Sequence, residues 1–134
     1  MRVHISRCVV ELIQRAADEA APHEACGLLF GGDRTVDAAR IAANVAENPL
    51  IHFEIDPAAL FAAIRAERAG GPVLAGYWHS HPSGDATPSA TDAAMAAPDG
   101  KLWLIVAGGV VTGWRAVANG CHHGRFAPIV LETG

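Results

Sequence analysis

The sequence predicts an α/β (α+β) fold in which helices flank one largely antiparallel sheet. Length and composition indicate a globular core: the chain has 134 residues, of which 51% are hydrophobic and 18% are charged, and cores of roughly 100 to 150 residues are the commonest domain size. Helical and strand patterns follow one another without strict alternation, without an internal repeat and without a long linker. We therefore expect a single domain over residues 1–134.

Three segments have the pattern of a helix. The first begins at Ser6, an N-capping residue, and its apolar residues recur at i, i+3 and i+4 until Pro22 ends the helix. The second is expected over residues 58–69, because Asp56 is an N-cap, a proline occupies the first turn and a Gly-Gly pair closes the segment. A shorter, alanine-rich helix is expected over residues 89–97.

Six segments are predicted to be strands, because apolar, β-branched and aromatic residues fill them between turn residues. They are residues 26–30, 35–45, 73–81, 102–107, 110–117 and 126–131. The first two are expected to form a hairpin, since a Gly-Gly-Asp turn joins them. The last is expected at an edge of the sheet, because Pro128 lacks the N–H that a central strand needs and would break it.

Charge and hydropathy exclude two classes of protein. Lys and Arg number 10 against 14 Asp and Glu, a net charge of -4, so a broad basic face for nucleic acid is not expected. No window holds the roughly 18 uncharged apolar residues that a membrane span needs, and Glu11 and Arg15 come too early for a signal peptide. We therefore expect a cytoplasmic protein with no membrane or nucleic-acid partner.

The cysteines indicate a reduced protein. Cys8, Cys26 and Cys121 are an odd number at wide spacing, whereas disulfide frameworks belong to small secreted domains that lack a sufficient core. We expect three free thiols. Cys26, inside a predicted strand, is expected to be a buried side chain rather than a nucleophile.

The segment WHSHPSGDATPSATD, residues 78–92, carries the strongest chemical signal. Side chains two apart on a strand point to one face, so His79 and His81 are expected to present their imidazoles side by side at the strand end. Asp92 lies inside the helix that follows, where a carboxylate can return to the same point. Two imidazoles and one carboxylate leave a fourth position for water, which is typical of a catalytic zinc site, whereas thiolates more often close a structural one.

Other interpretations of these residues stay open at this point. Ser89-x-x-Asp92 is a capping box in its own right, which explains both residues without a metal. Asp85, in the loop before the helix, is an alternative third ligand, although the S-x-x-D context favours Asp92. The Cys-His-His run of residues 121–123 has metal-binding residue types, but it lies between two glycines in a predicted loop.

Several of these segments together resemble a known family, the JAB1/MPN/Mov34 metalloproteases with their JAMM signature, and in particular its small prokaryotic members. The resemblance rests on PHEACGLLFG at residues 22–31, HSHP at 79–82 and SATD at 89–92. Residues 44–49 and the helix start at 53–57 match the small prokaryotic members as well. The combination covers nearly the whole chain and is more specific than any one motif.

The resemblance implies a JAMM/MPN-like fold, with the layering of cytidine deaminases, and one zinc ion bound by His79, His81 and Asp92. It also implies that Glu24 is the catalytic glutamate, which takes a proton from zinc-bound water and later delivers it to the leaving amine. Ser89 falls on the family's oxyanion-stabilising serine. The alternative for Glu24 is a surface charge at a helix end.

The resemblance further implies a zinc-dependent peptidase or isopeptidase that cuts after the C-terminal Gly-Gly of a small ubiquitin-like or sulfur-carrier protein. A sheet edge near the zinc would take an extended tail by strand addition, and a narrow cleft would admit glycine while rejecting larger side chains. One alternative is a non-catalytic MPN binding scaffold, although all five site residues are present here. Another is a RadC-like JAB domain linked to DNA repair, whose loop motif is close to residues 81–92, although that branch usually carries a further DNA-binding region.

Overall fold

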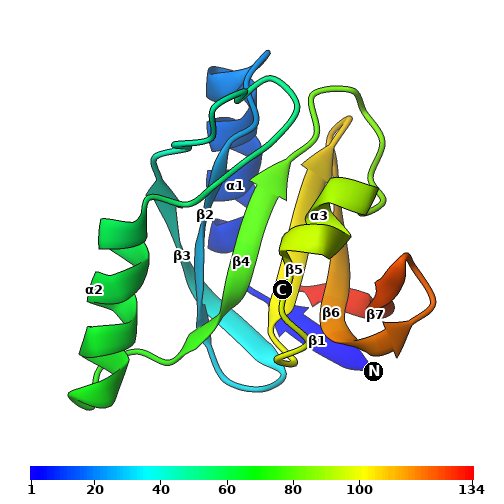
Figure 1. Ribbon diagram of the computed structural model, residues 1–134. Coiled ribbons are helices and arrows are strands. Elements are labelled where there is room, and N and C mark those ends of the chain that lie inside the picture. The colour runs from blue at the N-terminus through cyan, green and yellow to red at the C-terminus, as the bar shows by residue number, and fades with distance from the viewer.

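The computed structural model describes residues 1–134 as seven strands and three helices (Figure 1). The elements are β1 (Arg2–Ile5), α1 (Arg7–Ala20), β2 (Cys26–Gly31), β3 (Thr35–Ala42), α2 (Pro57–Arg68), β4 (Leu74–Ser80), α3 (Ala90–Met95), β5 (Leu102–Ala107), β6 (Val110–Gly120) and β7 (Gly124–Thr133). All three predicted helices and all six predicted strands are present, and β1 is an additional strand. No helix is both long enough and apolar enough to cross a membrane.

The strands form one sheet that closes on itself. Hydrogen bonds join them in the order β1-β3-β2-β4-β5-β6-β7, and β1 also pairs with β7. Four of the seven pairings are antiparallel, whereas β1–β3, β1–β7 and β4–β5 are parallel. The predicted mixed fold, with a largely antiparallel sheet and flanking helices, is therefore confirmed, and the closure is an addition to it.

The prediction that the last strand is a broken edge strand is wrong. β7 runs without a break and pairs with β6 on one side and with β1 on the other. Pro128 lies opposite Trp114 of β6, and the pairing of β7 with β1 begins only at Val130. The missing N–H of the proline is tolerated because Pro128 precedes the stretch in which β7 has a partner on both sides.

The helices cover both surfaces of the sheet (Figure 1). Leu28 and Leu29 are consecutive residues of β2, so their side chains point to opposite surfaces. Leu29 packs in the same cluster as Ile13 of α1, whereas Leu28 packs with Ala63 of α2. α3 contributes Ala93 to a third cluster, which is rich in aromatic residues. Burying these apolar faces fixes the two layers of helices relative to the sheet.

The register between β2 and β4 positions the residues that carry chemistry. Cys26 is opposite His79 across this pair of strands. At this end of the two strands, the N–H of Ala25 donates to Ser80 Oγ at 2.8 Å, and the N–H of Ser80 donates to the carbonyl of Ala25 at 3.0 Å. Glu24, one residue earlier, therefore lies at the same end of the sheet as the histidines.

Candidate functional site

Two histidines meet at the end of β4. His79 is the penultimate residue of the strand and His81 follows its last residue, so the two side chains share one surface, as the two-residue spacing predicts. Both are buried, and their Nε2 atoms lie 2.9 Å apart. The loop that leaves β4 and the loop between β3 and α2 lie at this same end of the sheet (Figure 1).

Asp92 returns to the histidines from the first turn of α3. Its Oδ2 atom lies 3.1 Å from the Nε2 atoms of both His79 and His81. The same oxygen accepts the N–H of Ser89 at 3.0 Å, and Ser89 Oγ accepts the N–H of Asp92 at 3.0 Å. The predicted capping box is therefore present. It does not compete with the cluster, because the capping contact itself aims the carboxylate at the imidazoles.

The imidazole rings are held in place from outside the cluster. Nδ1 of His81 lies 2.7 Å from the carbonyl oxygen of Asp85, which directs Nε2 toward Asp92 when Nδ1 carries the proton. The ring of His79 stacks on Phe53, with centroids 4.2 Å apart. Asp85 contacts the cluster through its backbone carbonyl, whereas its exposed carboxylate accepts hydrogen bonds from Thr87. The structure therefore brings Asp92, and not the Asp85 carboxylate, to the histidines.

Glu24 is a buried carboxyl group beside this cluster, with 7% of its surface exposed. Its carboxyl oxygen lies within 4.8 Å of the ligand atoms of His79 and His81, and its Oε1 atom has no hydrogen-bond partner. The residue lies between α1 and β2, and its N–H donates to the carbonyl of Pro49 at 2.8 Å. Glu24 is therefore not the solvated helix-end charge that the alternative interpretation required.

The two carboxyl groups have opposite electrostatic properties. Burial raises the pKa of Glu24 to about 7, while His81 lowers it and Asp92 raises it further. Burial alone would also raise the pKa of Asp92, but hydrogen bonds with the two histidines hold that pKa well below its usual range. Burial lowers the pKa of His79. One carboxylate therefore stays ionised, and the other exchanges a proton near neutral pH.

This set of donors fits a divalent metal ion. Two imidazole nitrogens 2.9 Å apart repel each other through their lone pairs unless a proton or a cation lies between them. The Asp92 oxygen adds a negative charge equally close to both. Nitrogen and oxygen atoms of this kind are ligands of zinc and related metals. The orphaned Oε1 of Glu24 leaves one more oxygen available at the same place.

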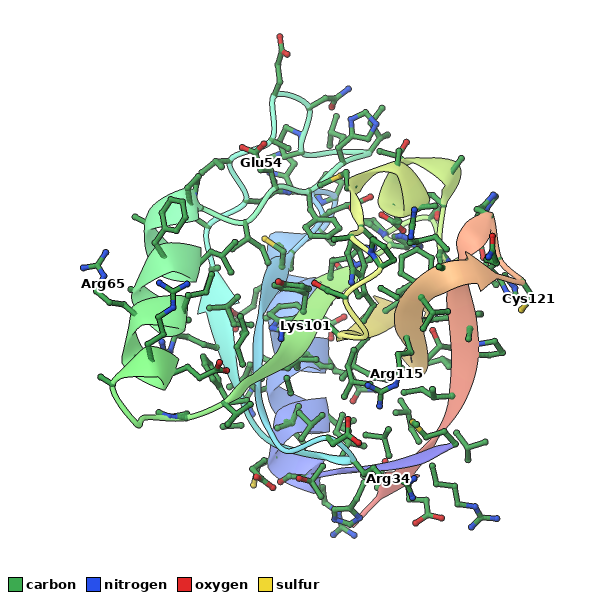
Figure 2. All side chains as sticks on the ribbon, turned by 60° about the horizontal axis from the view of Figure 1, so that its bottom comes forward. Arg34, Glu54, Arg65, Lys101, Arg115 and Cys121 are labelled. Carbon is green, nitrogen blue, oxygen red and sulfur yellow. The ribbon has the colours of Figure 1, made fainter.

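The other candidate residues lie elsewhere. The Cys-His-His run 121–123 is at the junction of β6 and β7, where Figure 2 shows Cys121 at the rim of the molecule. Cys121 Sγ lies 3.4 Å from Nδ1 of its neighbour His122, whose ring packs on Trp114. Cys26 is fully buried, which confirms the prediction of a buried side chain, and burial raises its pKa to about 12.

Three residues around the cluster were not identified as functional from the sequence. Phe53 stacks on His79, and Leu50 and Ile51 line a cavity of about 200 Å³ together with Glu24 and Ser89. All three belong to the loop between β3 and α2. Their spacing has no helical or strand period, so no local signal distinguished them from an ordinary surface loop.

Comparison with known proteins extends these observations. The desampylase of Haloferax volcanii is 38% identical over 99 residues, which cover 70% of this chain and 71% of that protein. The probable TtuB-protein conjugate cleaving protease of Thermus thermophilus is 34% identical over 90 residues, 67% of this chain and 60% of that protein. The crystal structure of AF2198, a JAB1/MPN domain protein from Archaeoglobus fulgidus, superposes with a TM-score of 0.61 at 21% identity and covers 98% of both chains.

These matches confirm the JAMM/MPN-like fold and the resemblance noted in the sequence. Residues 6–119 match the family model described as prokaryotic homologs of the JAB domain. That range contains every element from α1 to β5 and most of β6. The chain belongs to the Prok-JAB family, the prokaryotic homologs of the JAB domain.

Proposed function

We propose that this JAMM-type hydrolase is a zinc-dependent peptidase or isopeptidase that cuts after the C-terminal Gly-Gly of a small ubiquitin-like or sulfur-carrier protein. One observation carries the proposal: two imidazole nitrogens and a carboxylate oxygen converge within 2.9 to 3.1 Å beside a buried carboxyl group that has an unpartnered oxygen. The names of the two relatives, a desampylase and a protease that cleaves TtuB-protein conjugates, support hydrolysis of protein conjugates.

His79, His81 and Asp92 would hold the metal. A zinc ion bound to two imidazoles and a carboxylate supplies a Lewis acid and a water of lowered pKa. The residues themselves favour this role, since Asp92 stays ionised and the Asp85 carbonyl orients His81.

Glu24 serves as the proton carrier. A general base works best when its pKa is near the working pH, and burial brings the pKa of Glu24 to about 7. The unpartnered Oε1 is free to accept the proton of the attacking water. The same carboxyl group then delivers that proton to the amine that leaves when the amide bond breaks.

Ser89 supplies a hydrogen-bond donor to the carbonyl oxygen under attack. Its Oγ atom accepts the N–H of Asp92, which occupies a lone pair but not the hydroxyl proton. That proton can point into the cavity that Ser89 lines with Glu24 and His81. Capping and oxyanion stabilisation are therefore compatible in one side chain.

The surroundings of the site favour an extended, narrow substrate. The cavity at Glu24 and Ser89 is about 200 Å³, below the roughly 300 to 1,000 Å³ of typical small-molecule pockets. A larger groove of about 660 Å³, lined in part by Ile41, Ala42 and Pro49, also reaches Glu24.

β3 pairs with β1 only at its first two residues, so its outer edge along residues 37–42 has no strand partner. A peptide tail added to this edge would be directed toward Glu24.

The test uses ubiquitin-like carriers with a short peptide appended after Gly-Gly, incubated with the protein with and without a chelator and analysed by mass spectrometry. We expect release after the second glycine, loss of release with chelator, and no release when either glycine is replaced by leucine. Equal cleavage of Gly-Gly and Leu-Leu tails would contradict the carrier specificity and leave a general metallopeptidase. Binding of an intact carrier without cleavage would instead support the scaffold alternative.

A further inference from the structure

The side chain of Asn44 has every hydrogen-bonding group occupied. Its Nδ2 donates to the backbone carbonyls of Glu24 at 2.8 Å and His52 at 3.1 Å. Its Oδ1 accepts the N–H groups of Ala46 at 3.0 Å and Glu54 at 3.1 Å. A primary amide has two donors and an acceptor oxygen with two lone pairs, so this side chain is saturated. All four bonds go to backbone groups.

These bonds join Glu24 to the loop of residues 45–54. The carbonyl of Glu24 accepts from Asn44, and the N–H of Glu24 donates to the carbonyl of Pro49 at 2.8 Å. Both backbone polar groups of Glu24 are therefore bonded to residues of the short stretch 44–49. The ends of the loop are also tied, because Asn44 forms an isolated β-bridge with Ile55.

The loop has no helix or strand of its own between its ends, so its shape depends on such contacts. It nevertheless contributes side chains to the site: Leu50 and Ile51 line the cavity at Glu24, and Phe53 stacks on His79. Figure 1 shows the loop between β3 and α2 passing over the end of the sheet where β2 begins, and Figure 2 shows Glu54 near its end. The side-chain amide of Asn44 therefore holds both the backbone of Glu24 and the loop that lines the cavity beside it.

We propose that Asn44 is a positioning residue, which fixes the backbone of Glu24 through one N–H of its amide and the loop of residues 45–54 through the other N–H and the two bonds that its oxygen accepts. Its effect on turnover rests on the proposed function. Its effect on the loop does not, because the four hydrogen bonds exist without substrate. Asn44 touches no reacting atom and acts only through Glu24 and the loop.

Two substitutions disturb the hold on Glu24 and the hold on the loop to different extents. Asn44→Asp keeps the oxygen that accepts from Ala46 and Glu54, but it removes both donors and places a second oxygen against the carbonyls of Glu24 and His52. Asn44→Ala removes all four bonds. Asn48→Ala is the matched control, since Asn48 is exposed in the same loop and its side chain makes none of these bonds.

Steady-state kinetics on a cleavable Gly-Gly fusion measure the effect of Asn44 on the position of Glu24. For Asn44→Asp we expect kcat to fall by about 10- to 100-fold, the effect of a small displacement of a catalytic group, while KM changes by less than about threefold. For Asn44→Ala we expect the same fall in kcat together with a higher KM, because the cavity wall is also loosened. Asn48→Ala should match the wild type. A kcat of Asn44→Asp within about twofold of the wild type would overturn the positioning of Glu24.

Amide hydrogen exchange without substrate measures the hold of Asn44 on the loop of residues 45–54. We expect exchange of residues 45–54 to be at least about threefold faster in Asn44→Ala, which loses all three bonds to the loop, and to increase less in Asn44→Asp, which keeps the two bonds from Ala46 and Glu54. Wild-type exchange in Asn44→Ala would overturn the role in the loop even if the protein cleaves Gly-Gly fusions. Conversely, a wild-type protein that cuts no Gly-Gly fusion would contradict the proposed function, while faster exchange would still support the hold on the loop. Metal content and melting temperature establish that each variant is folded.

Discussion

Replacing Glu24 with glutamine isolates the proton chemistry from everything else at the site. The two side chains have nearly the same shape, and the Oε1 atom of Glu24 makes no hydrogen bond that the amide would lose. The backbone bonds to Asn44 and Pro49 are unaffected by the substitution. Glu24→Gln should therefore fold, keep its metal and lose turnover.

The size of the loss follows from the role of the carboxyl group. General acid–base catalysis contributes about 10²- to 10⁴-fold, so kcat should fall by at least about 100-fold. In the wild type, kcat/KM should fall as the pH drops through the pKa of Glu24, because only the ionised carboxylate accepts a proton. A bound cation favours that ionised form and moves this acid limb below pH 7.

The pH dependence of the stability of the metal-free protein gives an independent test of the raised pKa of Glu24, and its direction follows from that shift. The pKa of Glu24 is raised from 4.5 to about 7 by burial, so the folded state holds its proton more tightly than the unfolded state does. Stability contributed by the protonated form is complete below about pH 4.5 and is lost as the pH rises toward 7. Glu24→Gln has no such group, so its melting temperature should fall less than that of the wild type between these pH values.

The assay compares wild type, Glu24→Gln and Glu11→Gln on one Gly-Gly fusion, with zinc content measured on the same samples. Glu11 is an exposed residue of α1, so its substitution controls for the loss of a surface charge. Activity of Glu24→Gln within about threefold of the wild type would refute the reasoning. Loss of zinc in this variant would show instead that Glu24 is a ligand.

Three further predictions concern the metal, the cap and the thiols. His79→Ala and Asp92→Ala should each lose most of about one bound zinc per chain in metal analysis of protein purified without chelator, and full retention by both would place the metal elsewhere. Ser89→Ala should lower the melting temperature by about 4 °C, because about 1 kcal/mol of helix capping is lost. It should also reduce kcat at least tenfold while zinc is retained. A lower melting temperature with unchanged kcat would mean that Ser89 only caps the helix. A thiol reagent at pH 8 should modify two cysteines quickly in the native protein and the third, Cys26, only on unfolding, since burial raises its pKa to about 12; three fast thiols would contradict this.

Local signals predicted the helix starts well. Ser6, Asp56 and Ser89 are N-caps in the structure, and the side chain of each accepts a backbone N–H from the first turn of its helix. These interactions join residues two or three apart, so the information lies within a short stretch of sequence. The strand over residues 102–107 has the predicted bounds for a similar reason, because all six of its residues are buried and turn residues flank it.

The strand β1 and the closure of the sheet could not be predicted in this way. β1 has four residues, and its Val3 and Ile5 alternate with exposed neighbours over too short a stretch to form a recognisable pattern. Its partners are β3 and β7, and Val3 pairs with Leu131 near the other end of the chain. The same long-range pairing made the prediction for β7 wrong, since a strand at the end of the chain looks like an edge until β1 covers it.

The sequence by itself determined the proximity of His79 to His81, which follows from the two-residue period of a strand, and the orientation of Asp92, which follows from its capping box with Ser89. Only the tertiary structure placed Glu24 beside them, because that contact depends on the register of β2 against β4, more than 50 residues apart in the chain. The hold of Asn44 on Glu24 and the stacking of Phe53 on His79 have the same origin. Periodicity and capping act over a few residues and leave a trace in the sequence, whereas strand pairing and loop closure are decided by how distant apolar surfaces pack together.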